Sequence, residues 1–471
     1  MRSIVWFRGK DLRVLDHRPL TSALAMGEVL PIFIFDPYFF APDKTSQMPH
    51  RIQFLLDSVH ELKSKLNALG SDLICLHGKS FGRLQEVVEM WQADQVVASR
   101  WIERFGRKRD ESIADRLTVP FQLFEGETLV PPGSVLTGSR TPFRVFTPFY
   151  RTFLRQFTLE PPLPQPNRLP PLSPELQRLD EGIPTLSDVG LDRNPRVIQG
   201  GEDAAWQRLN EFIDGPAAVY SKGRNRLDRA GTSRISADLK FGLLSPLQVW
   251  WAMENAEERP RDAGSFLRQL VWREFSHHTL WHQPHLLEKP FRPDFEGFPW
   301  LDDPGGWDAW VTGQTGYPVV DASARQLLAE GFVPNRARMI SASFLTKHLG
   351  IDYRRGEAHY LRYLVDGDWA QNNLGWQWSA GCGCDAQPYF RVFNPILQGQ
   401  KFDPAGTWVR QWVPELAELP KRWIHEPWNA PEKVLTAAGV ELGATYPEPV
   451  VEHRFARQRF LATAKAHLSK A

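Results

Sequence analysis

The chain has 471 residues, of which 42% are hydrophobic and 24% charged, and its formal net charge is +1 at pH 7. This length is sufficient for two or more domains, each with its own core. The composition excludes wholesale disorder and a membrane protein. The near-zero net charge excludes a uniformly basic nucleic-acid binder, although a local basic groove is compatible with it.

Cysteine usage argues against a metal centre. Cys75, Cys382 and Cys384 are too few for a four-thiolate iron–sulfur or zinc site, and C-G-C differs from the C-x-x-C metal and redox patterns. We therefore predict no bound metal, and a reducing bacterial cytoplasm as the setting. The chain begins with a strand-like run at residues 3–7 and has no long apolar span, so we expect neither a signal peptide nor a transmembrane helix.

The first part of the chain alternates short apolar runs with helical patterns such as that of residues 51–70. The apolar runs lie at 3–7, 29–35, 72–78 and 95–100. This alternation predicts a Rossmann-like α/β domain with a parallel sheet in residues 1–130. No G-x-G-x-x-G follows the first run, so the usual dinucleotide fingerprint is absent.

Proline dominates the next part, in P-P-G at Pro131 and in PPLPQPNRLPPLSP from Pro161. This composition favours extended, poorly helical chain, so we predict an interdomain linker at residues 131–199. Beyond it the patterns are helical, as in residues 264–282, and strand signals nearly vanish. We therefore predict an all-helical domain at residues 200–471.

The segment DGDWAQNNLGWQW, which begins at Asp366, combines polar and aromatic side chains. Asp366, Asp368 and Asn372 offer polar groups, whereas Trp376 and Trp378 offer flat apolar surface. This mixture suits a planar heterocyclic ligand with polar edges. A tryptophan-rich core helix followed by a loop would explain any one of these residues, but it has no use for so many buried polar groups together.

Two further regions carry weaker signals. Residues 220–236, YSKGRNRLDRAGTSRIS, end in a hydroxyl-rich turn that opens a helix and can bind a phosphate, although an ordinary N-cap cluster gives the same pattern. W-R-E-F at Trp272 and N-R-A-R-M at Asn335 place cations where they can meet a ligand. A structural ion pair and a solvated helix face explain these two motifs equally well.

The order of these motifs along the chain resembles the photolyase/cryptochrome family. It comprises Y-x-x-x-R at Tyr220, T-S-R-I-S, L-V-W-R-E-F, T-G-Y-P-V-V-D-A at Thr315, N-R-A-R-M, D-G-D-W-A-Q-N-N, G-W-Q-W and P-Y-F-R-V-F-N-P. The N-terminal W-F-R-G-K-D-L-R-V-L-D-H-R-P-L and F-R-V-F-T-P-F-Y-R-T-F at Phe143 match it too. The resemblance covers nearly the whole chain, and it is greatest to bacterial photolyases that repair cyclobutane pyrimidine dimers in DNA.

The resemblance implies an FAD held in a U shape by the helical domain, whose fully reduced form injects an electron into a thymine dimer after absorbing blue light. It implies that Arg273 pairs with Asp366, that Arg338 lies beside the flavin ring and that Asn372 faces flavin N5. The implied cofactor-binding residues are Tyr220, Thr232, Ser233, Arg234, Ile235, Ser236, Arg273, Asn335, Arg338, Asp366, Gly367, Asp368 and Asn372.

The resemblance also implies ultraviolet-damaged DNA as the partner. Because a lesion inside a duplex cannot touch a buried flavin, the dimer must be flipped out, as photolyases do with their target bases. Trp272 and Trp378 would form aromatic walls, Met339 the floor and Asn335 an edge contact. The residues expected to line the strand are Arg224, Arg336, Arg391, Gln398 and Lys401.

Two positions depart from the family pattern in the repair machinery. Gln269 stands where most dimer photolyases have glutamate; it can hydrogen-bond a thymine edge but cannot supply a carboxyl proton, so repair slows or its specificity changes. Six-four repair is not expected, because its histidine pair would fall at Pro334 and Asn335. The family's electron relay corresponds to Trp376, Tyr353 and Trp300, and the central tyrosine is harder to oxidise without losing its proton, so photoreduction slows or uses another tryptophan.

The antenna region is a third departure. Gly106 stands where folate-binding relatives have glutamate, which favours an 8-hydroxy-deazaflavin over methenyltetrahydrofolate, yet Trp101 is bulky where deazaflavin-binding relatives have aspartate. Either antenna chromophore, or a pocket filled by the protein, is compatible with this sequence.

We predict a monomeric photolyase whose catalytic residues are Trp376, Tyr353, Trp300, Asn372, Gln269, Trp272 and Met339. A cryptochrome, a photoreceptor that binds FAD but signals through a partner, is the main alternative. The chain ends at Ala471 without the long tail that cryptochromes often carry, which favours the enzyme. A dark flavin oxidoreductase would need a nicotinamide site, and the sequence shows none.

Overall fold

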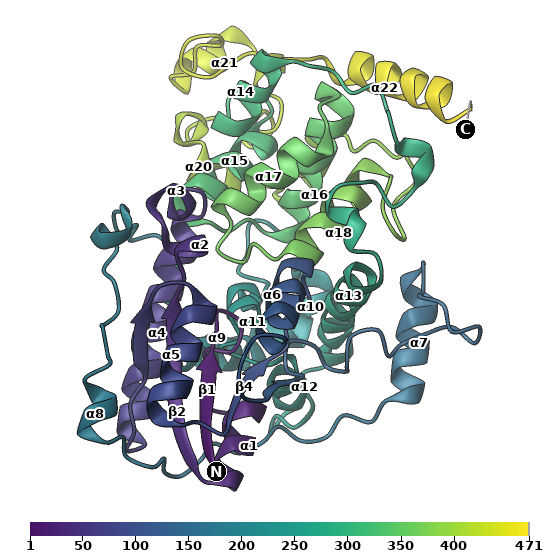
Figure 1. Ribbon diagram of the computed structural model, residues 1–471. Coiled ribbons are helices and arrows are strands. Elements are labelled where there is room, and N and C mark those ends of the chain that lie inside the picture. Colours follow the sequence, from purple (N-terminus) through teal and green to yellow (C-terminus); the bar gives the residue numbers. More distant parts are fainter. Residues whose placement is uncertain (470–471) are drawn as a thin grey trace. The chain divides into compact units, whose positions relative to one another are not determined.

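A computed structural model describes residues 1–469 (Figure 1). The chain forms two compact units. The first comprises residues 1–218, 233–284 and 365–367, and the second comprises 219–232, 285–364 and 368–471. Residues 200–218 and 233–284 thus belong to the same compact unit as the N-terminal part. The domain boundaries that the sequence predicts, at residues 130 and 199, stay a prediction.

The first unit contains a five-stranded sheet in the order β3-β2-β1-β4-β5, with every pair parallel. The strands are β1 (Arg2–Phe7), β2 (Glu28–Phe35), β3 (Ile74–His77), β4 (Gln95–Ser99) and β5 (Phe121–Phe124). Ile4 of β1 aligns with Leu30 on one side and Val96 on the other, and all three are fully buried, as expected for a parallel sheet covered on both faces. The strand order reverses at β1, and such a point leaves a crevice at the carboxyl ends of the strands.

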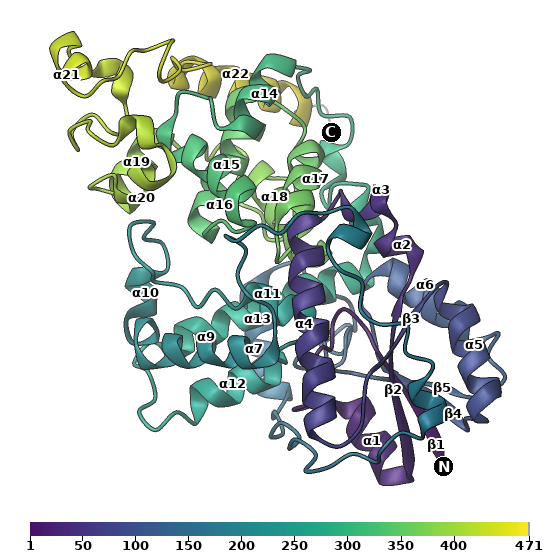
Figure 2. The same ribbon diagram turned by 90° about the vertical axis from the view of Figure 1, so that its left-hand side faces the viewer.

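Helices pack on the sheet and continue the first unit beyond it, as Figure 2 shows for α4 and α5. They are α1 (Arg18–Met26), α2 (Pro37–Phe40), α3 (Pro42–Thr45), α4 (Pro49–Ala68), α5 (Ser80–Trp91), α6 (Arg104–Ala114), α7 (Phe146–Gln156), α8 (Pro174–Gln177), α9 (Glu202–Asp214), α11 (Ser236–Phe241), α12 (Pro246–Glu254) and α13 (Ala263–His282). The predicted linker contains α7 and α8, whereas residues 161–173 form no helix or strand, as their prolines predict.

The second unit is helical. Its helices are α10 (Tyr220–Gly223), α14 (Pro304–Thr312), α15 (Pro318–Glu330), α16 (Asn335–Ser343), α17 (Tyr353–Tyr363), α18 (Trp369–Ala380), α19 (Pro395–Phe402), α20 (Thr407–Trp412), α21 (Glu432–Ala437) and α22 (His453–Leu468), and a π-helical turn at Phe344–Leu349 extends α16. Trp310, Tyr360 and Trp376 lie in its core, so large aromatic residues build much of this region. No strand lies beyond residue 124 in the described part of the chain.

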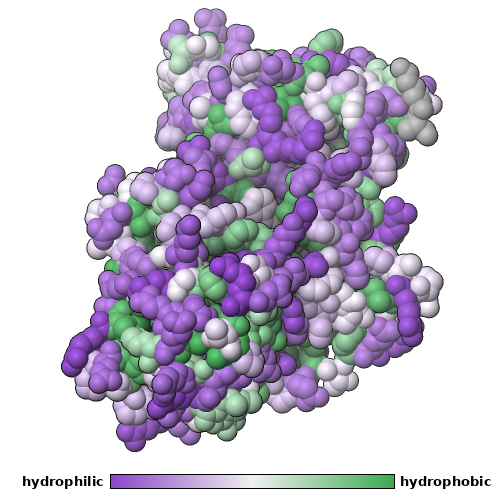
Figure 3. All heavy atoms as spheres, in the orientation of Figure 1, coloured by the Kyte–Doolittle hydropathy of each residue, from purple (hydrophilic) through white to green (hydrophobic). Residues whose placement is uncertain are grey.

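The face drawn in Figure 3 is mainly hydrophilic, with small apolar patches between polar side chains. Within residues 1–469, no helix has both the length and the apolar character needed to cross a membrane. These two observations agree with the amphipathic patterns from which the helices were predicted.

Candidate functional site

The start of α18 builds the polar part of the candidate site. Asp368 is 2% exposed and caps the helix, because its carboxylate accepts a hydrogen bond from Gln371 N at 2.8 Å. This cap fixes the first turn of the helix, and Asn372 N donates to Asp368 O at 2.9 Å. The backbone of Asn372 therefore lies in a helical turn that the buried Asp368 carboxylate caps.

The two adjacent amides have different roles. Asn373 and Gln377 are buried, and both donate to Leu286 O, at 2.9 and 3.0 Å; Asn373 also donates to the Glu357 carboxylate at 3.0 Å. These contacts hold α18 in the core. Asn372 is half-buried, and its Nδ2 donates to Glu357 O at 3.0 Å.

That one bond fixes the amide of Asn372, because the nitrogen must face the carbonyl and the oxygen the other way. Among the described residues, Asn372 Oδ1 accepts no hydrogen bond. The site therefore presents a hydrogen-bond acceptor at the position that the sequence predicts to face a flavin nitrogen.

Arg51, on α4, lies beside Asp366 in the first unit. Arg51 Nη1 donates to Gly367 O at 3.3 Å. Burial lowers the pKa of Arg51 to about 10, and the negative charge of Asp366 opposes that shift. The sequence did not single out Arg51, because its spacing in α4 is that of any residue on an amphipathic helix.

The expected pairing of Arg273 with Asp366 is not formed. Arg273 is 4% exposed, and its guanidinium donates to two backbone oxygens, Glu127 O at 2.6 Å and Leu239 O at 3.5 Å. Both acceptors lie in the first unit, and Leu239 belongs to α11. Arg273 thus ties α13 to α11, while Arg51 lies close enough to Asp366 to respond to its negative charge.

The expected cofactor-binding residues of the segment 220–236 fall in both units. Ser233, Arg234, Ile235 and Ser236 precede or begin α11 in the first unit, where Arg234 adopts a positive φ of 56°. Asp238 anchors this helix through Arg208, at 2.5 Å. Tyr220 and Thr232 belong to the second unit. Binding of one cofactor by all of these residues therefore stays a prediction.

Three of the predicted strand-binding cations gather in the second unit. Arg336 donates to Asn225 Oδ1 at 2.9 and 3.2 Å, and its guanidinium carbon lies 4.5 Å from the Phe402 ring centre. Burial and the neighbouring charge of Arg224 both lower the pKa of Arg336. Lys401 Nζ lies 5.4 Å from the same Phe402 ring centre. The loop before α11 and the end of α19 therefore form one basic surface.

A glycine pair closes the loop that carries Arg224. A Cβ on Gly231 would lie 2.6 Å from Gly223 O, so the two backbone segments meet only because residue 231 has no side chain. Leu227 N donates to Phe402 O at 2.9 Å, which fixes the loop on α19. The loop is thereby held as a rigid platform for its arginine.

Trp272 lies on α13 with one ring face covered. Its ring stacks on Phe146 of α7, with ring centres 3.8 Å apart and planes at 9°. Gln269, three residues earlier, is half-buried and donates to Ser265 O at 3.3 Å through Nε2. Trp272 and Gln269 thus lie one turn apart on α13 in the first unit, and their roles toward a flipped base stay a prediction.

The remaining predicted contacts lie in the second unit. Asn335 is exposed at the start of α16, and its Nδ2 lies 3.6 Å from Met339 Sδ one turn later. Arg338 donates to Val333 O at 2.7 Å. Trp378 is half-buried, Arg391 is exposed, and Gln398 Oε1 is buried.

Direct ring contacts join only two of the three residues of the predicted relay. Trp300 and Tyr353 are in edge contact, with ring centres 6.4 Å apart. The rings that touch Trp376 are those of Trp310, at 6.0 Å, and Tyr360, at 5.2 Å. Among the described residues, Tyr353 makes no ring contact with Trp376.

At the carboxyl end of β4, in the predicted antenna region, basic side chains surround Trp101. The Trp101 ring lies under the guanidinium of Arg109, at 4.4 Å, and also contacts Arg8 and Lys10, both at 5.5 Å. A Cβ at residue 106 would lie 2.6 Å from Trp101 Cβ. Gly106 therefore makes room for Trp101, and the two departures noted in the sequence form one structural feature.

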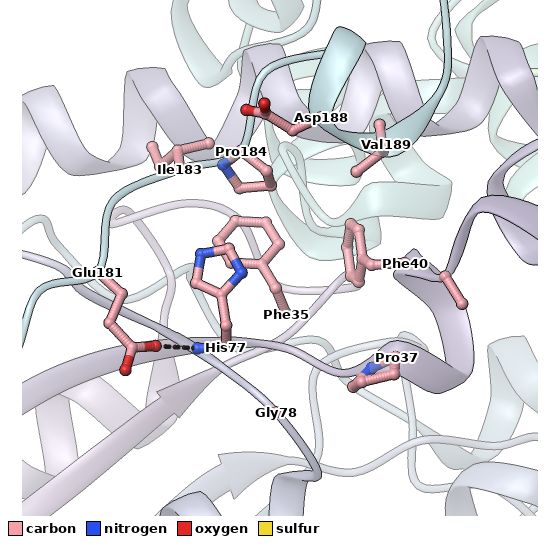
Figure 4. A pocket seen from close by; sticks show the side chains of 11 residues that line it. Phe35, Pro37, Phe40, His77, Gly78, Glu181, Ile183, Pro184, Asp188 and Val189 are labelled. Carbon is pink, nitrogen blue, oxygen red and sulfur yellow. Dashed lines mark hydrogen bonds between the residues drawn. The ribbon is translucent and has the colours of Figure 1, made fainter.

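A pocket of about 420 Å³ lies at the carboxyl ends of β2 and β3 (Figure 4), and no motif in the sequence indicated it. Phe35 and His77 stack there, with ring centres 5.1 Å apart, and Phe40 meets Phe35 edge-on at 4.9 Å. Glu181 accepts from His77 N at 2.5 Å at the rim. The remaining lining is mostly apolar, so the pocket suits a small flat molecule better than a polyanion.

Comparisons with known proteins agree over the whole chain. Family models described as "DNA photolyase" and "FAD binding domain of DNA photolyase" match residues 3–167 and 266–466. The deoxyribodipyrimidine photo-lyase of Agrobacterium fabrum is 39% identical over 473 residues, which cover 98% of this chain and 97% of that protein. A solved bacterial class III photolyase from Agrobacterium tumefaciens matches with a TM-score of 0.91 and 38% identity, over 100% of this chain and 98% of that one. A Synechocystis cryptochrome matches with a TM-score of 0.86 and 29% identity, over 98% and 99%.

Proposed function

Because the chain belongs to the DNA photolyase family, we propose that it is a deoxyribodipyrimidine photolyase, which uses blue light to split cyclobutane pyrimidine dimers in DNA. When bound, reduced FAD supplies the electron that opens the dimer. The protein contributes binding, orientation and exclusion of water.

The observation that carries this proposal is the fixed amide of Asn372. Its Nδ2 is committed to Glu357 O, so Oδ1 is the atom available to a ligand. A reduced flavin carries a hydrogen on N5, which makes N5 a donor that matches this oxygen. A neutral amide accepts that bond without taking a proton, whereas an aspartate could exchange one. Asn372 therefore suits the reduced form of the cofactor, which is the form that repair requires.

The basic surface of the second unit supports DNA as the partner. Arg224, Arg336 and Lys401 supply cations for phosphates. In the first unit, Trp272 is backed by Phe146 on one face, so its other face is held rigidly for an unstacked base. Gln269 would then bond a thymine edge through its amide.

A cryptochrome function is the second candidate, because the Synechocystis cryptochrome shares the fold over nearly the whole chain. The two functions differ in what illuminated, reduced protein does to a bound dimer. We further propose that the protein is a monomer in the cytoplasm of a bacterium; light scattering during gel filtration tests the first part.

The test is to mix chemically reduced protein with ultraviolet-damaged oligothymidine and to illuminate with blue light. A photolyase restores the ultraviolet absorbance of thymine, and the same sample in the dark does not. Binding to the damaged strand without recovery of absorbance would favour the cryptochrome and overturn the repair proposal.

A further inference from the structure

We propose that Trp376, Trp310 and Trp307 form the path by which electrons reach the photoexcited oxidised flavin, in place of the path through Tyr353. The inference rests on the binding of FAD beside Trp376, and it concerns the recharging of the cofactor rather than repair. All three tryptophans lie in the second unit, on α18 and α14.

The geometry of this path is continuous. Trp376 meets Trp310 edge-on, with ring centres 6.0 Å apart and planes at 74°, and Trp310 lies 5.6 Å from Trp307. Both separations are those of aromatic rings in van der Waals contact. Trp307 and Trp310 are three residues apart on α14, so they share one face of that helix. Trp310 is 1% exposed and Trp307 is half-buried, so the path leads from the core toward solvent.

Tyr353 is poorly suited to carry the hole, which is the positive charge left on a ring after it gives up an electron. Its hydroxyl is buried and has no hydrogen-bond partner among the described residues, and burial raises its pKa. Oxidation of a phenol is favourable only when its proton can leave, and no base accepts this one. Tyr360 also touches Trp376, but its hydroxyl bonds to the Ser323 hydroxyl at 3.2 Å rather than to a base.

The surroundings of Trp310 favour a positive charge on its ring. Its indole N–H donates to Ser341 O at 3.2 Å, which directs the negative end of a carbonyl dipole at the ring and retains the proton. The nearby imidazole of His359, 5.4 Å from Trp310, has its pKa lowered to about 4 by burial and is neutral at pH 7. It therefore adds no repulsion to the hole.

Trp307 is suited to end the path. The guanidinium of Arg355 lies 4.4 Å from its ring centre and opposes a cation there, but not a neutral radical. One electron leaves Trp376 for the flavin, Trp310 refills Trp376, and Trp307 refills Trp310. The indole N–H proton of Trp307 then passes to water, and a thiol in solution returns one hydrogen atom to the neutral Trp307 radical.

The experiment follows the radicals by transient absorption after a blue flash on the FAD-loaded protein. Trp310→Phe is expected to slow the electron transfer that refills Trp376 by about tenfold or more, which corresponds to about 1.4 kcal/mol in barrier. Trp307→Phe is expected to remove the long-lived neutral tryptophan radical, and Tyr353→Phe to leave both signals unchanged. Trp412→Phe, in the same unit but outside these ring contacts, is the matched control.

Repair of damaged oligothymidine by chemically reduced Trp310→Phe and Trp307→Phe proteins separates this inference from the proposed function. We expect wild-type repair in both, because neither residue carries the electron to the dimer. Loss of the radical signals in Tyr353→Phe with normal signals in Trp310→Phe would overturn the proposal. A tyrosyl rather than a tryptophan radical in the wild-type spectrum would overturn it as well.

Discussion

Gly356, on α17, is the position where one added methyl group should disturb the core beneath the candidate site. A Cβ there would lie 2.5 Å from Leu345 Cδ2 and closer still to the ring edge of Trp376. Because carbon atoms rest about 3.5–4.0 Å apart, the neighbours must retreat by about 1 Å or more. Overpacking of this kind costs about 1–3 kcal/mol, and the better helix propensity of alanine offsets about 1 kcal/mol of it.

We therefore expect Gly356→Ala to lower the free energy of unfolding by up to about 2 kcal/mol. The assay is urea denaturation followed by tryptophan fluorescence, and the change should appear in the midpoint without a change in slope. Gly375→Ala is the matched control, because a Cβ at this exposed position of α18 meets no atom within 4 Å. It should stabilise the protein by about 1 kcal/mol. Equal stabilisation by both substitutions would refute the packing argument.

Three further predictions concern pH, DNA binding and turnover. Burial raises the pKa of Glu357 to about 7 from 4.5, so the folded state binds more protons than the unfolded state between these values. The stability that Glu357 contributes is fully present below pH 4.5 and is lost as the pH rises through 7. Urea midpoints should therefore decline over this pH range, and Glu357→Gln should flatten the decline. An equally steep decline in the variant would contradict the role of Glu357. Arg336→Ala should reduce the steepness of log affinity for damaged DNA against log salt concentration by about 0.9, because one phosphate contact is lost. Fluorescence anisotropy measures both slopes, and equal slopes for the variant and the unchanged protein would show that Arg336 contacts no phosphate. Gln269→Glu should raise the yield of dimer repair per absorbed photon, because a carboxyl group can supply a proton; an equal or lower yield would show that glutamine is no handicap.

Much of the fold follows directly from the sequence. The runs at 3–7, 29–35, 72–78 and 95–100 correspond to β1 to β4, because strands buried on both faces need uninterrupted apolar residues. β5 was not predicted, since Phe121–Phe124 is short and lies half-exposed at the edge of the sheet. The helical pattern of residues 264–282 corresponds to α13 almost residue for residue.

The site was predictable where its chemistry lies within one local segment. Asp368, Asn372 and Trp376 share α18, so their spacing alone places them together. Contacts between distant segments were not predictable: Arg51 reaches Gly367 across 316 residues, and Trp310 meets Trp376 from another helix. The pairing assigned to Arg273 failed for the same reason, because its acceptors, Glu127 O and Leu239 O, are backbone groups that no motif announces.

The most direct test of the account uses an oligonucleotide with one thymine dimer and chromatography that separates the damaged from the repaired strand. Reduced, FAD-loaded protein should convert the damaged strand to the intact one under blue light, and not in the dark. If the bound strand still carries its thymine dimer after illumination, the assignment of this chain as a DNA repair enzyme is contradicted.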